Sequence, residues 1–135
     1  MIHSDDQLVI VYIHKGAANY THLSTKGEIK KRDLILLNPG QTLEIEPIRK
    51  LEWIVIRLTG IVFTSSLEIN SLSQLFIISD ANQTIKLYLD LALIEREQQF
   101  RGSDIILKKL LECVMVHVLR HNELSIKDSS IQVKH

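Results

Sequence analysis

The stretch from Lys26 to Gly60, KGEIKKRDLILLNPGQTLEIEPIRKLEWIVIRLTG, decides the fold of this chain. It holds three short apolar runs: Leu34–Leu37, Leu43–Glu46 and Leu51–Leu58. The first two are separated by Asn38-Pro39-Gly40, where proline lacks an N–H and glycine tolerates a positive φ, so this tripeptide should reverse the chain. Pro47 to Lys50 forms the second separator. The pattern predicts a meander of β-strands.

The third run has apolar residues on both faces. One face carries Leu51, Trp53, Val55 and Arg57, and the other carries Ile54, Ile56 and Leu58. A strand of this kind is usually covered on both sides. If one side is the interior of a barrel, Trp53 and Arg57 point into it, where an indole and a guanidinium suit a small polar ligand.

Length and composition narrow the class of protein. The chain has 135 residues, which is enough for one domain with a proper core, and its 16 basic and 16 acidic residues cancel. That balance argues against a stand-alone nucleic-acid binder. The single cysteine, Cys113, and the lack of a signal peptide or long apolar run favour a cytoplasmic protein with no membrane span.

The N-terminal half reads as strands and turns. Residues 1–7 are polar and predict an N-terminal arm, and residues 8–64 predict a β-barrel or sandwich of about six or seven strands. The expected elements are a strand at Leu8–Ile13, a turn at Gly16–Asn19, a weaker strand at Tyr20–Ser24 and a turn at Thr25–Gly27, after which Ile29–Arg32 leads into the central apolar runs.

The C-terminal half reads as helices. Ser71 and Gln74 have the spacing of a capping box, which predicts a short helix at Leu72–Ile78. Asp80 and Gln83 repeat this spacing before a longer helix at Thr84–Phe100, and Ser103 can cap a second long helix that ends near His121. The predicted fold class is therefore α+β, with a β-barrel followed by two or three helices.

The two long helices carry more apolar residues than one sheet can cover. We therefore expect residues 71–122 to form a helical region through which two copies of the chain associate. The expected interface residues are Leu107, Leu110, Leu111, Val114 and Val118. Alternatively, the short helix at Leu72–Ile78 covers the excess within one chain.

The central stretch resembles a known family. Gly27, then Asp33-Leu-Ile-Leu-Leu-Asn-Pro-Gly40, then Leu51-Glu-Trp-Ile-Val-Ile-Arg-Leu-Thr-Gly60, is similar to the N-terminal sensor domain of AraC-type bacterial transcription regulators. The resemblance spans roughly residues 8–122. It implies a cupin-like (jelly-roll) barrel, a small-molecule effector such as a sugar or metabolite, and a dimerisation element in the trailing helices.

Some positions depart from the family pattern. Arg32 stands where the family usually has glycine, Leu58 where it often has phenylalanine, and Leu43 near a position where many members carry histidine. The resemblance also implies that residues 123–135 begin a linker to a DNA-binding helix-turn-helix domain, through which alone DNA would be contacted.

Most of the candidate ligand residues are polar or aromatic side chains on otherwise apolar strands, and the aliphatic Val55 is included with them. They are Tyr12, His14, Tyr20, His22, Trp53, Val55 and Arg57. Of these, Trp53 and Val55 match pocket positions implied by the resemblance. The alternative is ordinary packing or solvent exposure, and a strand register shifted by one residue would turn each side chain to the opposite face.

Catalysis has little support in the sequence. A cupin metal site needs a His-x-His pair and later ligands, and none is present; no cofactor is expected. Cys113, His117 and His121 align along one helix and could bind zinc, although a buried cysteine and partly exposed histidines are ordinary there. We therefore expect a non-enzymatic effector sensor. The alternatives are a small metal-dependent cupin enzyme (isomerase, epimerase or dioxygenase), which metal analysis would reveal, and a sensor that has lost its ligand, with a pocket filled by its own side chains.

Overall fold

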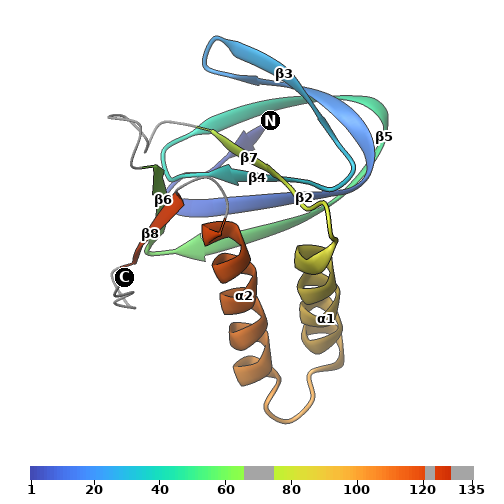
Figure 1. Ribbon diagram of the computed structural model, residues 1–135, viewed down its shortest axis with the longest axis vertical. Helices are drawn as coiled ribbons and strands as arrows, with labels where there is room; N and C mark the ends of the chain where they lie inside the picture. Colours follow the sequence, from blue (N-terminus) through green and yellow to red (C-terminus); the bar gives the residue numbers. More distant parts are fainter. Residues whose placement is uncertain (66–74, 121–123, 129–135) are drawn as a thin grey trace.

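A six-stranded antiparallel sheet and a helical hairpin make up most of the structure, a computed structural model that describes residues 1–65, 75–120 and 124–128 (Figure 1). The sheet contains β1 (Ile2–His3), β2 (Gln7–His22), β3 (Thr25–Lys30), β4 (Asp33–Leu37), β5 (Thr42–Thr59) and β7 (Phe76–Ser79). A separate two-stranded sheet joins β6 (Ile61–Ser65) to β8 (Leu124–Asp128), and the helices are α1 (Thr84–Gln98) and α2 (Ser103–Leu119).

Strand β2 is the centre of the main sheet. The strand order is β1-β5-β2-β4-β7, and β3 pairs with the second half of β2. The α+β class with a mostly antiparallel sheet is therefore confirmed. The predicted barrel is not, because the strands of the described residues do not close on themselves.

Both faces of the sheet are packed, because residues on β2 and β4 alternate between two apolar cores. The helix-side core joins the sheet to α1 and α2 and contains Leu8, Ile10, Tyr12, Leu34, Leu36, Phe76, Ile78, Ile85, Leu89, Val114, Met115 and Val118. The far-side core covers the other face and contains Ile2, Val9, Val11, Ile13, Ala18, Ile29, Ile35, Leu37 and Leu43. Successive residues of a strand point to opposite faces, which is why each strand serves both cores.

Two predicted turns are wrong, and both segments lie inside long strands. The segment Gly16–Asn19 bends β2 at a register shift, with Gly16 at φ +92° and so close to β5 that an added Cβ would lie 2.1 Å from the Lys50 carbonyl oxygen. The segment Pro47–Lys50 continues β5, where Pro47 pairs with Ala18. Proline is tolerated there because β5 has an open edge at this point among the described strands.

Other boundaries shift as well. The turn expected at Thr25–Gly27 lies at residues 23–24, where Leu23 has φ 55°, and Ile29 belongs to β3. The turn at Asn38-Pro39-Gly40 is confirmed, with Gly40 at φ 80°.

The two ends of the chain also differ from prediction. Residues 1–7 are not a free arm, since β1 pairs with β5 and the buried Ser4 hydroxyl donates to the Asn38 carbonyl oxygen at 2.7 Å. Residues 124–128, assigned to a linker, form β8 against β6.

The helices are close to those predicted, with one exception. The two long helices begin and end within two residues of the expected positions. The short helix expected at Leu72–Ile78 is wrong for residues 76–78, which belong to β7 and pair with β4; its start and the Ser71–Gln74 box lie outside the described residues. Instead of a third helix, these residues form β7, which extends the sheet beside β4.

Candidate functional site

An apolar groove lies where the second half of β5 meets the helical hairpin. Its volume is about 270 Å³, and its walls are Ile54, Val55, Ile56, Arg57, Leu89, Ala92, Leu93, Arg96, Leu107 and Leu111. These residues come from one strand and both helices. A shift of the hairpin against the sheet would therefore change the shape of the groove.

The strand wall of the groove is the edge of β5. Side chains of consecutive strand residues point to opposite faces, so a groove lined by all four of Ile54–Arg57 must run along the strand edge. On its other edge this part of β5 pairs with β2, where Ile54 faces Tyr12 and Arg57 faces Val9. No described strand pairs with the groove edge at these residues, so peptide groups are available there.

The helix wall comes from one stripe on each helix. Ile85, Leu89, Ala92 and Arg96 follow the spacing of a single helix face. The first three are buried, whereas Arg96, one turn further on, is exposed. On α2, Leu107 and Leu111 precede the buried Val114 and Val118 on the same stripe. The hairpin extends beyond the sheet (Figure 1), so the distal part of both stripes is left to line the groove.

The charged residues that line the groove have one sign. Among the described residues, Arg57 and Arg96 line it and no acidic residue does. One Arg57 guanidinium nitrogen, Nη1, donates to the backbone oxygen of His3 at 3.0 Å, which leaves other N–H groups of the fork free. Arg96 forms no hydrogen bond or ion pair with any described residue.

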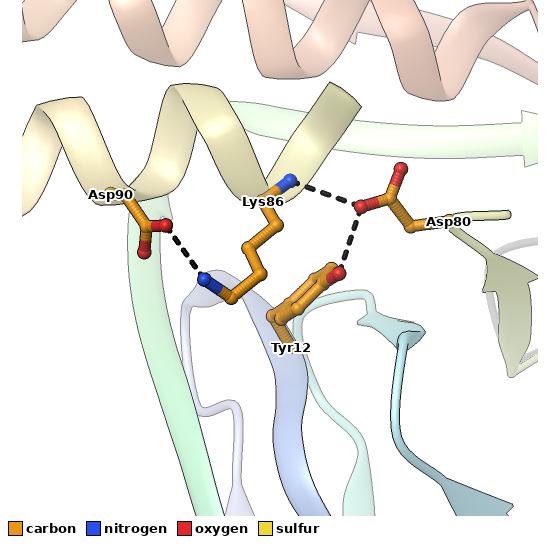
Figure 2. Close-up of polar contacts among 4 residues, drawn as sticks. All are labelled: Tyr12, Asp80, Lys86 and Asp90. Carbon is orange, nitrogen blue, oxygen red and sulfur yellow. Dashed lines mark hydrogen bonds and ion pairs between the residues drawn. The ribbon is translucent and has the colours of Figure 1, made fainter. Parts of the chain in front are cut away.

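A buried polar cluster ties the sheet to the start of α1 (Figure 2). The Asp80 carboxylate accepts hydrogen bonds from the Tyr12 hydroxyl at 2.8 Å and from the backbone N–H groups of Ile85 at 3.1 Å and Lys86 at 3.0 Å. Lys86 in turn forms an ion pair with Asp90 at 2.7 Å. Asp80 therefore satisfies two of the free N–H groups at the helix N-terminus and also holds β2. Burial, followed by the hydrogen bond to Asp80, raises the pKa of Tyr12 well above its ordinary value of 10.0.

The predicted ligand residues do not form one site. Tyr12 lies in the helix-side core, whereas Trp53, Val55 and Arg57 lie on the other face of β5, where Trp53 is 39% and Val55 38% exposed. That face of the third run is therefore not covered, contrary to the expectation. Only Val55 and Arg57 of the predicted set line the groove.

The remaining three residues of the set have local roles. His14 is exposed beside a register shift in β2. The ring of Tyr20 packs over Gly27, its partner on β3, so closely that an added Cβ would lie 2.6 Å from the Tyr20 hydroxyl. His22 is buried and shares a hydrogen bond of 3.0 Å with the Gln41 side-chain oxygen.

The predicted interface residues on α2 do not form a free surface. Val114 and Val118 are buried in the helix-side core, Leu107 and Leu111 line the groove, and Leu110 is half-buried. Exposed apolar residues of α2 lie at other positions, Ile105, Ile106 and Val116, and α1 carries an exposed apolar stripe at Leu87, Leu91 and Ile94, which are 56%, 42% and 53% exposed. The spacing i, i+4, i+7 places these three side chains together, opposite the buried stripe.

The part of the chain that the structure describes holds neither a cluster of metal ligands nor a membrane-spanning helix. The ring of His117 packs against Tyr88 with centroids 5.3 Å apart, Cys113 is a half-buried free thiol, and His121 lies outside the described residues. Within the described ranges no three His, Cys, Asp or Glu side chains gather around a common point, and no helix has the length and apolar character to cross a membrane.

Comparison with known families agrees with this architecture. The sequence model of the AraC-like ligand binding domain matches residues 2–113, which cover the main sheet, α1 and most of α2. The chain belongs to the AraC-like ligand binding domain family. A comparison with curated proteins gives no match.

Much of the groove of this AraC-like domain is built from residues that the sequence analysis did not select. Ile54 and Ile56 were assigned to the opposite face of the third run, and Leu89, Ala92, Leu93 and Arg96 were not selected as ligand residues. Arg96 could have been noticed, because a guanidinium sits at the fourth position of an otherwise apolar helix stripe. No local sequence pattern indicates that this helix stripe packs beside the edge of β5.

Proposed function

We propose that this AraC-like domain is the effector-sensing part of a cytoplasmic AraC-type transcription regulator and that it acts by binding rather than by catalysis. The family match supports small-molecule binding. The equal numbers of acidic and basic residues support a role in which a separate domain contacts DNA. In this proposal, ligand binding changes how the attached DNA-binding domain is arranged.

The effector binds in the groove between β5 and the hairpin. The observation that carries this assignment is an apolar hollow of about 270 Å³ with two arginines, at the junction of the two parts of the domain. The far-side core, by contrast, is filled by its own side chains, with Val9, Val11 and Ile13 fully buried. The groove is therefore a better ligand site than the sheet face that carries the far-side core.

The hairpin carries the response. Residues of both helices line the groove, and α1 also bears the exposed stripe of Leu87, Leu91 and Ile94. We propose that this stripe, rather than the α2 face expected from the sequence, pairs two copies of the chain. A ligand that fits one hairpin position better than another would shift the population between them.

A thermal-shift screen of sugars, acids and other metabolites tests this function. A bound compound should raise the melting temperature in a concentration-dependent way. Leu93→Glu places a charge in the groove and should abolish the shift, whereas Ile105→Glu, on an exposed helix position outside the groove, should leave it unchanged.

Other outcomes would overturn parts of the proposal. If Trp53→Ala abolishes the shift and Leu93→Glu does not, the effector binds on the exposed face of β5 that carries Trp53, opposite the helices. If no compound stabilises the protein, the ligand-sensing function is contradicted. A stoichiometric, tightly held iron, manganese or zinc would instead favour the cupin enzyme.

A further inference from the structure

We infer that the groove is a site for a small organic anion with an apolar body, such as a medium-chain carboxylate, and that Arg96 binds its charged end. This inference rests on the proposed function and names the chemical class of the effector. It follows from the position, the charge and the size of the groove.

The charge of the lining selects an anion. Arg57 and Arg96 are the charged groups of the groove, and the other eight lining residues are aliphatic. Arg96 has no partner among the described residues, and Arg57 uses Nη1 on the His3 carbonyl oxygen. A guanidinium has five N–H donors in a planar fork that matches a carboxylate, so both side chains have donors left for a ligand.

The position of Arg96 makes its charge available to a ligand. It continues the stripe of Ile85, Leu89 and Ala92, and at that position a leucine would complete the apolar surface. Arg96 also borders a second, more polar hollow beside the α1–α2 turn, together with Glu95, Ser103 and Asp104. Glu95 is already bonded to Ser103 at 2.7 Å and lines the second hollow only. The arginine therefore stands at the polar end of the apolar groove.

The size of the groove selects a small ligand. Its volume of about 270 Å³ is close to the lower end of the range for small-molecule sites, roughly 300–1,000 Å³. The aliphatic walls favour burial of methylene groups, each contributing about 0.8 kcal/mol when fully buried. A compact acid with a short alkyl or ring body fits these limits better than a sugar, whose hydroxyl groups would meet few polar side chains in the groove.

Octanoate, octan-1-ol and octylamine test the inference because they share a chain and differ in the head group. Isothermal titration with the intact chain should show saturable binding of one octanoate per chain, with octan-1-ol at least roughly threefold weaker and octylamine weaker still. Octanoate should perturb backbone amide resonances at Ile54–Arg57, Leu89–Arg96 and Leu107–Leu111.

Arginine variants locate the charged end. Arg96→Gln should weaken octanoate roughly three- to tenfold while leaving octan-1-ol unchanged, and Arg96→Lys should restore part of the loss. Arg101→Gln is the matched control, because Arg101 is exposed near the same turn but does not line the groove. Added salt should weaken octanoate and not the alcohol.

Each remaining outcome counts against the inference. Equal binding of octanoate and octan-1-ol, an Arg96→Gln variant with unchanged affinity, amide shifts confined to Trp53 and the far-side core, or no octanoate binding at millimolar concentration would each overturn it. If another metabolite then stabilises the chain in the thermal-shift screen, the proposed sensing function stands and only the anion site is lost. If nothing stabilises it, both fail.

Discussion

At the scale of single residues, the contact between Tyr12 and Asp80 is a buried polar link between the sheet and the start of α1. Asp80 is 5% exposed and accepts three hydrogen bonds, one from β2 and two from the first turn of α1. Figure 2 shows the bonds from Tyr12 and from the Lys86 backbone. A carboxylate buried in this way is stable only while its donors are present. The start of α1 is therefore fixed relative to β2, whatever happens at the distal end of the hairpin.

Tyr12→Phe tests this link. Removing the hydroxyl leaves Asp80 with two donors, so the free energy of unfolding should fall by about 1.5 kcal/mol in urea titrations at neutral pH. Tyr20→Phe is the control, because the Tyr20 hydroxyl makes no hydrogen bond with described residues, and the change there should be within about 0.5 kcal/mol. Equal effects of the two substitutions would contradict the assigned role of Tyr12.

The same hydroxyl predicts a pH dependence. The pKa of Tyr12 is raised by folding above its ordinary value of 10.0, so the folded state holds its proton more tightly than the unfolded state does. Stability from this group is fully present below pH 10 and is lost as the pH rises above it. The stability difference between wild type and Tyr12→Phe should therefore shrink above pH 10, and a difference that grows there would show the opposite sign.

Arg32 is strained by its backbone. It has φ 76°, in the left-handed region where a residue with a Cβ costs about 1–2 kcal/mol, and the family resemblance of the sequence implies glycine at this position. Arg32→Gly keeps the backbone bonds of residue 32 to Ile13 and Asp80 and should raise the free energy of unfolding by roughly 0.5–1 kcal/mol, after the entropy of glycine is counted. Lys31→Gly, next in the chain but not at a positive φ, should lower it by a similar amount, and a stabilising Lys31→Gly would refute the explanation.

At the scale of elements, the sequence predicts what is locally encoded. The turn at Asn38-Pro39-Gly40 was predicted because its signal lies within three consecutive residues. The starts of the two long helices were placed to within two residues, but the predicted Ser103 cap is wrong, because Gly102 is the N-cap of α2 and Ser103 is its first residue. Gly16 and Pro47 carry the same type of signal, yet they bend long strands instead of ending them. Gly16 is needed because the Lys50 carbonyl oxygen comes so close, a contact between residues distant in sequence that no local pattern reveals.

The candidate site was less predictable than the elements for the same reason. Val55 and Arg57 were selected from strand periodicity, but their helix partners Leu89 and Arg96 reach them only through packing of the hairpin on the sheet. Tyr12 was placed with Trp53 because both interrupt apolar strands. Pairing of Tyr12 with Ile54 puts it on the opposite face, which is a question of register between strands.

The exposed stripe on α1 gives the prediction that belongs to this scale. Leu91→Glu should weaken dimerisation at least about tenfold in sedimentation equilibrium, because a carboxylate would replace an apolar contact at the centre of the stripe. Leu91 is 42% exposed, so folding should change little. Ile105→Glu, at a site 66% exposed outside the stripe, should leave association unchanged. A wild-type monomer at micromolar concentration, or equal effects of both variants, would rule out this interface.

At the scale of the whole molecule, the groove and the stripe are linked because α1 carries both. Leu89, Ala92 and Leu93 line the groove, and Leu91 and Ile94 belong to the exposed stripe on the opposite side of the same helix. The start of the helix is held by Asp80, whereas its distal half extends beyond the sheet (Figure 1). A ligand that fills the groove therefore acts on the part of the helix that is least fixed by the sheet.

This linkage predicts a reciprocal effect between effector and dimer. If the ligand changes the dimer dissociation constant by some factor, thermodynamic coupling requires that association change ligand affinity correspondingly. Saturating ligand should shift the dissociation constant roughly five- to a hundredfold, a usual range for coupled sites. The monomeric Leu91→Glu variant should then bind with the affinity extrapolated for wild type at high dilution. A ligand that binds wild type and Leu91→Glu equally at all protein concentrations would show that the two surfaces act independently. If they were coupled through α1, a change in dimerisation would have to change the ligand affinity of the groove.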